Sequence, residues 1–321
     1  MAKPKIYVQG GWNSDLYLSP ASRALLEQSL NPVYRPDLPA PKSEDETAER
    51  LKGCVAILSL NGAEDIKELT GAAVRKAGTV KTAVIGHWWH HCHEPMIAQW
   101  KAEGVEILDV SDGCNQATAE WATMACMMAA RRVIELDKGM KEGGWPQSRF
   151  PADLVCESTI GVIGLGRVGK IVAKQLKALD ANVIGWDGFM TPDAIRALGV
   201  EPVASLDDLM RRSDIVTMHL PITDATKSMV SAKHFSLMRD RTAFVNAGRA
   251  WTMDNAALLK ELQSGRLRAF LDVYETEPLP RNDPLRSLPN TILNAHVAGS
   301  GLSMFTRIVR LCAEALKRRL A

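Results

Sequence analysis

Three glycines at the spacing Gly-x-Gly-x-x-Gly constrain this chain more than any other feature of its sequence. Gly164, Gly166 and Gly169 follow an apolar strand-like run that starts at Thr159, and they open the helical pattern 170–179. In such a motif the first glycine allows a tight turn, the second lets the backbone approach a pyrophosphate, and the third permits close helix–strand packing. The N–H groups of the helix N-terminus then face the anion. The context predicts a dinucleotide-binding βαβ unit.

An acidic residue ends the next strand-like run. Asp187 closes the segment 183–187, where its carboxylate would accept hydrogen bonds from the adenosine ribose and repel a 2′-phosphate. Gly188, Phe189 and Met190 follow it and offer no cation to a 2′-phosphate. The sequence therefore favours NAD over NADP as the cofactor.

Alternating strand and helix patterns surround this motif. Six strand-like runs separated mostly by helical segments are expected at 159–164, 182–186, 215–219, 242–246, 269–273 and 291–293. This is the strand count of a doubly wound dinucleotide-binding domain. An earlier alternating set, with strands at 5–8, 55–60, 82–85 and 106–109, predicts a second parallel sheet. We expect an α/β fold of two Rossmann-like domains, one flavodoxin-like and one doubly wound, with a cleft between them.

The remaining segments suggest how these domains are connected. Residues 31–46 hold four prolines and several charges, which is typical of a surface connection, whereas the pattern of residues 117–136 predicts one long buried helix. The amphipathic pattern 304–320 is expected to return to the first domain. We therefore predict a substrate domain of residues 1–117 plus 297–321, and an NAD-binding domain of residues 118–296.

Composition limits the class of protein. The 321 residues carry 39 Lys and Arg against 37 Asp and Glu, a formal charge of +2 that argues against a dedicated nucleic-acid binder. No apolar stretch approaches the roughly 20 residues that span a bilayer, and no signal peptide is apparent. Six cysteines without a CxxC pair favour reduced thiols. We expect a cytoplasmic protein with neither nucleic-acid nor membrane partners.

Three downstream segments resemble the signatures of the NAD-dependent D-2-hydroxyacid dehydrogenase family. They are Val245-Asn-Ala-Gly-Arg249, Leu271-Asp-Val-Tyr-Glu-Thr-Glu277-Pro278 and Asn294-Ala-His296-Val-Ala-Gly299. The resemblance covers roughly residues 114–300 and only loosely the first hundred. It departs from the family pattern at Ala250, where Gly is usual, at Asn294-Ala295, where Thr-Pro is usual, and at the bulky Trp251.

The resemblance implies a catalytic set of Arg249, Glu277 and His296. The histidine would exchange the hydroxyl proton, the glutamate would fix its tautomer and favour imidazolium, and the arginine would hold the substrate carboxylate and polarise the carbonyl. With the fingerprint, it also implies a set of cofactor-binding residues: Gly164, Gly166, Arg167, Val168, Gly169, Asp187, His219, Pro221, Ala247, Gly248 and Asp272.

The segment 86–94 gathers four of the seven histidines and two of the eight tryptophans. We expect it to shape the substrate pocket through His87, Trp88 and Trp89, with Asn61 and, more weakly, Trp12 and Gly62 nearby. Two other interpretations are an apolar cluster with solvated histidines, and a metal site. We expect no metal, because imidazoles this dense in sequence seldom converge and hydride transfer to NAD needs none.

These observations favour an NAD-dependent dehydrogenase that interconverts a small 2-hydroxy acid and its 2-oxo acid. One alternative is a non-catalytic NAD(H)-sensing regulator. Another is an NAD-linked dehydrogenase for a different small anion or a sugar-derived acid. The family resemblance, with the apolar helix 117–136, also implies a homodimer.

Overall fold

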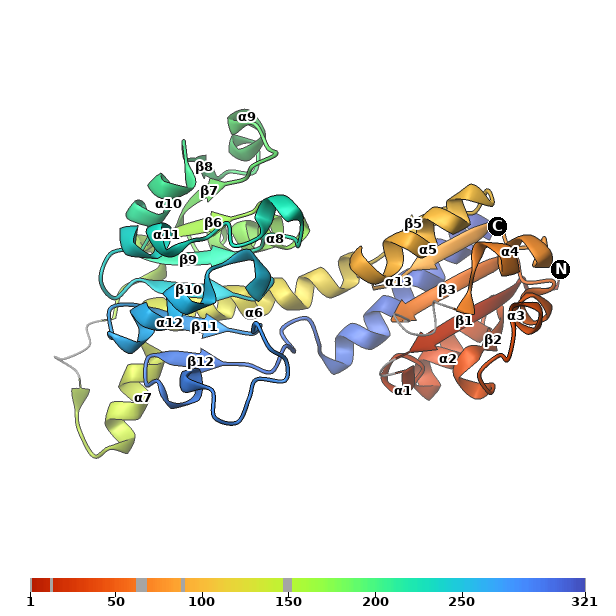
Figure 1. Ribbon diagram of the computed structural model, residues 1–321, viewed down its shortest axis with the longest axis horizontal. Helices are drawn as coiled ribbons and strands as arrows, with labels where there is room; N and C mark the ends of the chain where they lie inside the picture. The colour runs from red at the N-terminus through yellow and green to blue at the C-terminus, as the bar shows by residue number, and fades with distance from the viewer. Residues whose placement is uncertain (1, 12–13, 62–67, 88–89, 147–151, 321) are drawn as a thin grey trace. The chain divides into compact units, whose positions relative to one another are not determined.

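The computed structural model describes residues 2–11, 14–61, 68–87, 90–146 and 152–320. The chain divides into two compact units, Met1–Cys114 with Ser300–Ala321 (unit 1) and Asn115–Gly299 (unit 2). The chain leaves unit 1, builds unit 2, and returns to unit 1 with its last helix (Figure 1). The assignment of substrate binding to unit 1 stays a prediction.

Unit 1 is built on a five-stranded parallel sheet in the order β2-β1-β3-β4-β5. This is the order of flavodoxin-like folds, as predicted. The strands are β1 (Lys5–Gly11), β2 (Asn31–Tyr34), β3 (Ala56–Asn61), β4 (Thr82–Ile85) and β5 (Glu106–Asp109).

Helices cover this sheet in two groups. Leu51, Val74 and Trp100, from three successive helices, pack with strand residues in one apolar core. The C-terminal helix α13 instead contacts α1, α2, β3 and β4, so the chain's end packs within unit 1. The helices are α1 (Ser14–Tyr17), α2 (Pro20–Glu27), α3 (Glu44–Leu51), α4 (Gly71–Ala77), α5 (His90–Ala102) and α13 (Leu302–Leu320).

The prediction of an irregular connection over residues 31–46 is wrong at both ends. Asn31–Tyr34 form the strand β2, which pairs with β1, and α3 begins at Glu44. Proline is tolerated in β2 because this strand lies at the sheet edge, where not every N–H needs a partner. Ser43 caps α3 by accepting a hydrogen bond from Glu46 N at 3.2 Å.

Unit 2 is built on a seven-stranded parallel sheet in the order β12-β11-β10-β9-β6-β7-β8. It contains the doubly wound order, which reverses direction between β6 and β9. The strands are β6 (Thr159–Ile163), β7 (Asn182–Trp186), β8 (Glu201–Pro202), β9 (Ile215–Met218), β10 (Ala243–Asn246), β11 (Arg268–Leu271) and β12 (Thr291–Leu293). The sequence predicts six of these seven strands but not β8, which is two residues long.

Two apolar cores form against this sheet. Ala122 and Val172, from α6 and α8, pack with Val162 and Val245 in one core. Helices α10, α11 and α12 contribute to the other core. The helices are α6 (Asp112–Ala130), α7 (Val133–Lys141), α8 (Arg167–Lys177), α9 (Pro192–Arg196), α10 (Leu206–Arg212), α11 (Ala232–Leu237) and α12 (Asn255–Gln263).

The single long helix predicted over 117–136 is broken. Helix α6 ends at Ala130, Arg132 takes a left-handed φ of 48°, and α7 starts at Val133. Tertiary donors satisfy the end of α6, because Arg268 Nη1 donates to Ala129 O at 3.0 Å and Asp153 N donates to Ala130 O at 3.1 Å. Both partners are distant in sequence, so the local pattern did not reveal the break. Among the described residues no helix is both long and apolar enough to cross a membrane.

Candidate active site

The glycine motif forms the turn between β6 and α8. Gly164 has a φ of 83°, and a Cβ there would lie 3.0 Å from His219 O. A Cβ at Gly169 would lie only 1.9 Å from Gly164 O, so α8 can approach the turn only if this residue is glycine. A Cβ at Gly166 would meet no atom within 4 Å, and no side chain caps the N-terminus of α8 at this residue. The helix therefore presents N–H groups beside open space, next to Arg167 and Val168.

Asp187 ties this turn to the end of β7. Its Oδ2 accepts a hydrogen bond from Leu165 N at 2.8 Å, and its Oδ1 accepts from Phe189 N at 2.8 Å and Met190 N at 3.2 Å. The carboxylate is thus fixed beside the glycine turn. This arrangement suits a nucleotide whose pyrophosphate meets α8 and whose ribose lies near the end of β7.

His219 follows β9 and borders the same turn. Its Nε2 lies 2.9 Å from Thr217 Oγ1, whereas its buried Nδ1 has no hydrogen-bond partner in the described part of the chain. Burial lowers the pKa of His219 to about 4, so the ring is neutral near pH 7. A buried nitrogen without a partner next to the glycine turn is consistent with contact to a bound dinucleotide. The exposed Pro221 lies two residues on and accepts a hydrogen bond from Thr226 Oγ1 at 2.7 Å.

Arg249 is held at the end of the turn that follows β10. The buried Asn246 shapes this turn, because its Oδ1 accepts from Gly248 N at 2.9 Å and its Nδ2 donates to Arg249 O at 3.3 Å. Ala247 is also buried. Arg249 Nη1 donates to Gly248 O at 2.7 Å. Burial lowers the pKa of Arg249, and the carboxylates of Glu277 and Asp272 oppose that change.

The structure brings Glu277 and His296 into direct contact. His296 Nδ1 lies 2.6 Å from Glu277 Oε2, and both side chains are 34% exposed. Glu277 is itself fixed, because its Oε1 accepts a hydrogen bond from Tyr274 N at 2.9 Å. His296 has a left-handed φ of 54°, an uncommon conformation for a residue with a side chain. A histidine so constrained has its Nδ1 occupied and its Nε2 left for another partner.

Asp272 holds the chain on both sides of His296, through a side chain before it and through backbone N–H groups after it. Its Oδ1 accepts hydrogen bonds from Asn294 Nδ2 at 2.6 Å and Val297 N at 2.8 Å, and both of its oxygens lie 3.1 Å from Ala298 N. Asp272 is buried at the end of β11. The carboxylate therefore sets the loop that carries His296.

In unit 1, His87 follows β4. Its Nδ1 lies 3.1 Å from Tyr17 Oη and 3.4 Å from Cys114 Sγ. Asn61 is the last residue of β3. Trp88 and Trp89, with Trp12 and Gly62, lie outside the described residues. Within those residues no group of three His, Cys, Asp or Glu side chains could hold a metal ion.

A family model matches more than half of the chain. Residues 123–298 match the NAD binding domain of the D-isomer specific 2-hydroxyacid dehydrogenases. The chain belongs to the D-isomer specific 2-hydroxyacid dehydrogenase family. The family's NAD-binding domain thus contains the glycine turn, Asp187, Arg249, Glu277 and His296, and the prediction of NAD as cofactor is confirmed.

Curated relatives of the family agree with this assignment. The chain is 31% identical over 282 residues to a glyoxylate reductase of Korarchaeum cryptofilum, covering 86% of this chain and 83% of that protein. It is 37% identical over 212 residues to a D-3-phosphoglycerate dehydrogenase of Archaeoglobus fulgidus, covering 66% of this chain and 40% of that protein. A second D-3-phosphoglycerate dehydrogenase, from Methanocaldococcus jannaschii, is 29% identical over 277 residues, which cover 86% of this chain and 52% of that protein. The chain thus spans about half the length of these two dehydrogenases.

Solved structures share the whole fold. A D-2-hydroxyisocaproate dehydrogenase has a TM-score of 0.76 at 23% identity, with 99% of this chain and 97% of that chain covered. A phosphoglycerate oxidoreductase of Rhizobium etli has a TM-score of 0.79 at 24% identity, with 96% and 92% covered. At these identities the similarity extends to the fold, and the prediction of two Rossmann-like domains is confirmed.

Several residues that contact the predicted site residues escaped the sequence analysis. Tyr17 and Cys114 contact His87, and Tyr274 donates hydrogen bonds from its hydroxyl to Asn294 O at 2.6 Å and Leu271 O at 3.0 Å. Asn294 stood out only as a departure from the family pattern, without a role. Its contact with Asp272 joins β11 to the end of β12, a pairing that depends on the register of the sheet.

Proposed function

We propose that this chain is an NAD-dependent dehydrogenase that transfers a hydride between nicotinamide and C2 of a small 2-hydroxy or 2-oxo acid. The observation that carries the proposal is the contact of 2.6 Å between His296 Nδ1 and Glu277 Oε2, within a domain of this family. A histidine with one nitrogen held by a carboxylate is suited to move a proton at the other nitrogen.

His296 acts as the general acid and base. In the reduction of a 2-oxo acid its imidazolium gives the Nε2 proton to the carbonyl oxygen, and in the oxidation of a 2-hydroxy acid the neutral ring accepts the hydroxyl proton at Nε2. Glu277 fixes the tautomer by accepting from Nδ1–H and stabilises the imidazolium. NAD supplies the hydride carrier when it is bound.

Arg249 binds the substrate. Its guanidinium is planar and always charged, so it can pair with the carboxylate of the acid through two parallel hydrogen bonds. Partial burial strengthens that pairing because water competes less for the guanidinium. His87 is a candidate for further substrate contact, with Asn61, Trp88 and Trp89 proposed for the same role on the sequence alone.

Replacement of His296 tests this proposal. We expect His296→Ala to lower kcat for 2-oxo acid reduction by about 10²–10⁴-fold, because the proton donor is lost. NADH affinity, measured by nicotinamide fluorescence, should stay within a few fold. The substrate is first identified with a panel of 2-oxo acids that includes glyoxylate, hydroxypyruvate, pyruvate, phenylpyruvate and sugar-derived oxo acids, at the nicotinamide absorbance band.

His234→Ala is the matched control. His234 also faces a carboxylate, with its Nε2 3.4 Å from Asp207 Oδ1, but it lies on α11. This variant should keep its turnover. Full turnover by His296→Ala would contradict the proposed role. NADH binding without turnover of any oxo acid in the wild-type chain would favour the NAD(H)-sensing regulator instead.

We further propose that the chain forms a homodimer through the exposed apolar side chains of residues 124–146 and of Leu154. Six of the eleven large hydrophobic residues exposed in the described part of the chain lie there. Exposed apolar side chains concentrated in one part of the chain favour an interaction surface there, and a second copy can cover it with the same surface. These six residues are Met124, Met127, Val133, Met140, Trp145 and Leu154.

A further inference from the structure

A polar cavity of about 210 Å³ lies in unit 2 at the edge opposite the glycine turn. Ser158, Asp214 and Thr242 line it and immediately precede β6, β9 and β10, and Arg268 lines it as the first residue of β11. All these strands are parallel, so the cavity lies at their amino ends, whereas the glycine turn lies at the carboxyl ends. The cavity is therefore separate from the proposed dinucleotide site.

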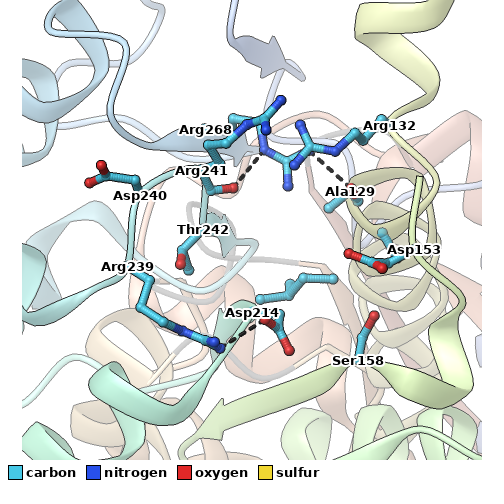
Figure 2. A pocket seen from close by; sticks show the side chains of 12 residues that line it. Ala129, Arg132, Asp153, Ser158, Asp214, Arg239, Asp240, Arg241, Thr242 and Arg268 are labelled. Atoms are coloured by element: carbon cyan, nitrogen blue, oxygen red, sulfur yellow. Dashed lines mark hydrogen bonds and ion pairs between the residues drawn. The ribbon is translucent and has the colours of Figure 1, made fainter. Parts of the chain in front are cut away.

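Four arginines line this cavity. Arg132, Arg241 and Arg268 gather on one side of it, and Arg239 pairs with Asp214 on the other (Figure 2). The Arg239 guanidinium is engaged through one nitrogen, because Nη2 lies 2.8 Å from Asp214 Oδ1 and 3.1 Å from Arg212 O. Asp240 is 81% exposed and pairs with Arg266 at 3.7 Å. Asp214 and Asp240 therefore have ion-pair partners other than Arg132, Arg241 and Arg268.

Two of these three arginines share one carboxylate. Glu135 Oε1 lies 3.1 Å from Arg268 Nη1 and 3.6 Å from Arg132 Nη1, and both arginine side chains are only 12% exposed. Burial is the largest cause that lowers the pKa of Arg132, and the charge of Arg241 lowers it further. Arg268 is held in place because it donates to Ala129 O and, at 2.9 Å, to Arg241 O.

Arg241 adds a third positive charge without a compensating ion pair in the described residues. Its backbone has a φ of 70°, and that of Arg132 has a φ of 48°. A side chain in this left-handed region costs about 1 kcal/mol relative to glycine. Asp214 and Asp240 also line the cavity but pair with Arg239 and Arg266, which leaves the shared Glu135 and the exposed Asp153 against these three arginines and one positive charge in excess.

We propose that this cavity binds a small phosphate-class oxyanion, either inorganic phosphate or the phosphate of a monoester. Guanidinium groups bind phosphate oxygens through paired, charge-assisted hydrogen bonds. Here three guanidinium groups converge from the end of α6, the start of β10 and the start of β11. A phosphate group between them more than offsets the one excess positive charge and links these three elements.

Calorimetric titration of the full chain with inorganic phosphate tests this proposal. NADH is kept saturating so that the pyrophosphate site is filled, and sodium chloride holds the ionic strength constant. We expect one saturable phosphate site per chain and a higher midpoint of thermal unfolding with phosphate. A parallel titration with glycerol phosphate distinguishes free phosphate from a monoester, because only a site open to the monoester binds both.

The decisive variant is Arg241→Gly. It removes one guanidinium and places glycine where φ is 70°, so the protein without phosphate should unfold at the same temperature or higher. Phosphate affinity should fall by about tenfold or more, since one charge-assisted hydrogen bond is lost. NADH affinity should not change.

Two controls separate the charge from the backbone. Ser228→Gly relieves a similar φ of 47° without removing an arginine, and Arg307→Gln removes one exposed positive charge on α13. Both should bind phosphate like the wild type. The proposal is overturned if NADH abolishes phosphate binding, if Arg241→Gly binds phosphate as tightly as the wild type, or if no saturable site is found. Weaker self-association of Arg241→Gly without any phosphate response would instead assign the arginines to a second copy of the chain.

Discussion

Single side chains decide the geometry of the catalytic loop. Asp272 is one carboxylate, yet it accepts hydrogen bonds from the Asn294 side chain before His296 and from Val297 N and Ala298 N after it. The left-handed φ of His296 persists because these bonds over-determine the loop. The resemblance predicted cofactor binding for Asp272, and that role stays a prediction beside the positioning role that the hydrogen bonds show.

At the same scale, His219 makes stability depend on pH. Burial lowers its pKa from 6.5 to about 4, so between these values the unfolded chain binds a proton that the folded chain does not. The free energy of unfolding should therefore fall on acidification from about pH 6.5 to about pH 4. We expect His219→Gln to flatten this dependence, measured by urea unfolding across that range.

His234→Gln provides the comparison for this measurement. Burial also lowers the pKa of His234, but Asp207 opposes the change. This variant should alter the pH dependence less than His219→Gln does. An unchanged slope in His219→Gln would show that His219 is solvated in the folded chain.

At the scale of elements, substitutions in the β6–α8 unit distinguish an effect on stability from an effect on cofactor binding. We expect Gly169→Ala to destabilise the fold by about 1–3 kcal/mol, since its Cβ would lie 1.9 Å from Gly164 O and the helix must shift. Gly166→Ala should cost less, about 0.5–1 kcal/mol, because its Cβ would meet no atom within 4 Å but alanine is a poorer N-cap than glycine. Both variants should lose NADH affinity, Gly166→Ala because its methyl group occupies the space beside the helix N-terminus.

Urea unfolding measures the change in stability, and NADH fluorescence titration measures the change in cofactor affinity. Normal NADH affinity in Gly166→Ala would contradict the placement of the pyrophosphate at α8. Gly301→Ala is the control, since its Cβ also meets no atom within 4 Å and it lies in unit 1. It should leave both measurements unchanged.

At the scale of the whole molecule, the exposed apolar side chains of α6 and α7 predict self-association. We expect Met127→Asp combined with Val133→Asp to shift the chain from dimer to monomer in sedimentation velocity, raising the dimer Kd by roughly a hundredfold or more. Each charge is buried twice in a two-fold interface, without a partner. Leu16→Asp is the matched control, because Leu16 is 41% exposed and Met127 38%. A monomeric wild-type chain would refute the homodimer.

The sequence by itself determined the features that depend on local chemistry. The spacing of Gly164, Gly166 and Gly169 requires a strand–turn–helix unit, and apolar runs bounded by polar turns located six of the seven strands of unit 2. The carboxylate at the end of β7 could be predicted from the position of Asp187 in the chain alone. These features follow from steric limits and periodicity over a few residues.

Only the tertiary structure decided which distant groups meet. Arg268 helps to end α6 by donating a hydrogen bond to Ala129 O. Residues 31–34 form the strand β2 because they pair with β1. Asn294 reached Asp272, and Arg132, Arg241 and Arg268 converged on one cavity, through the register and order of parallel strands. Long-range packing sets that register, and no local pattern encodes it, so these contacts could not be predicted from the sequence.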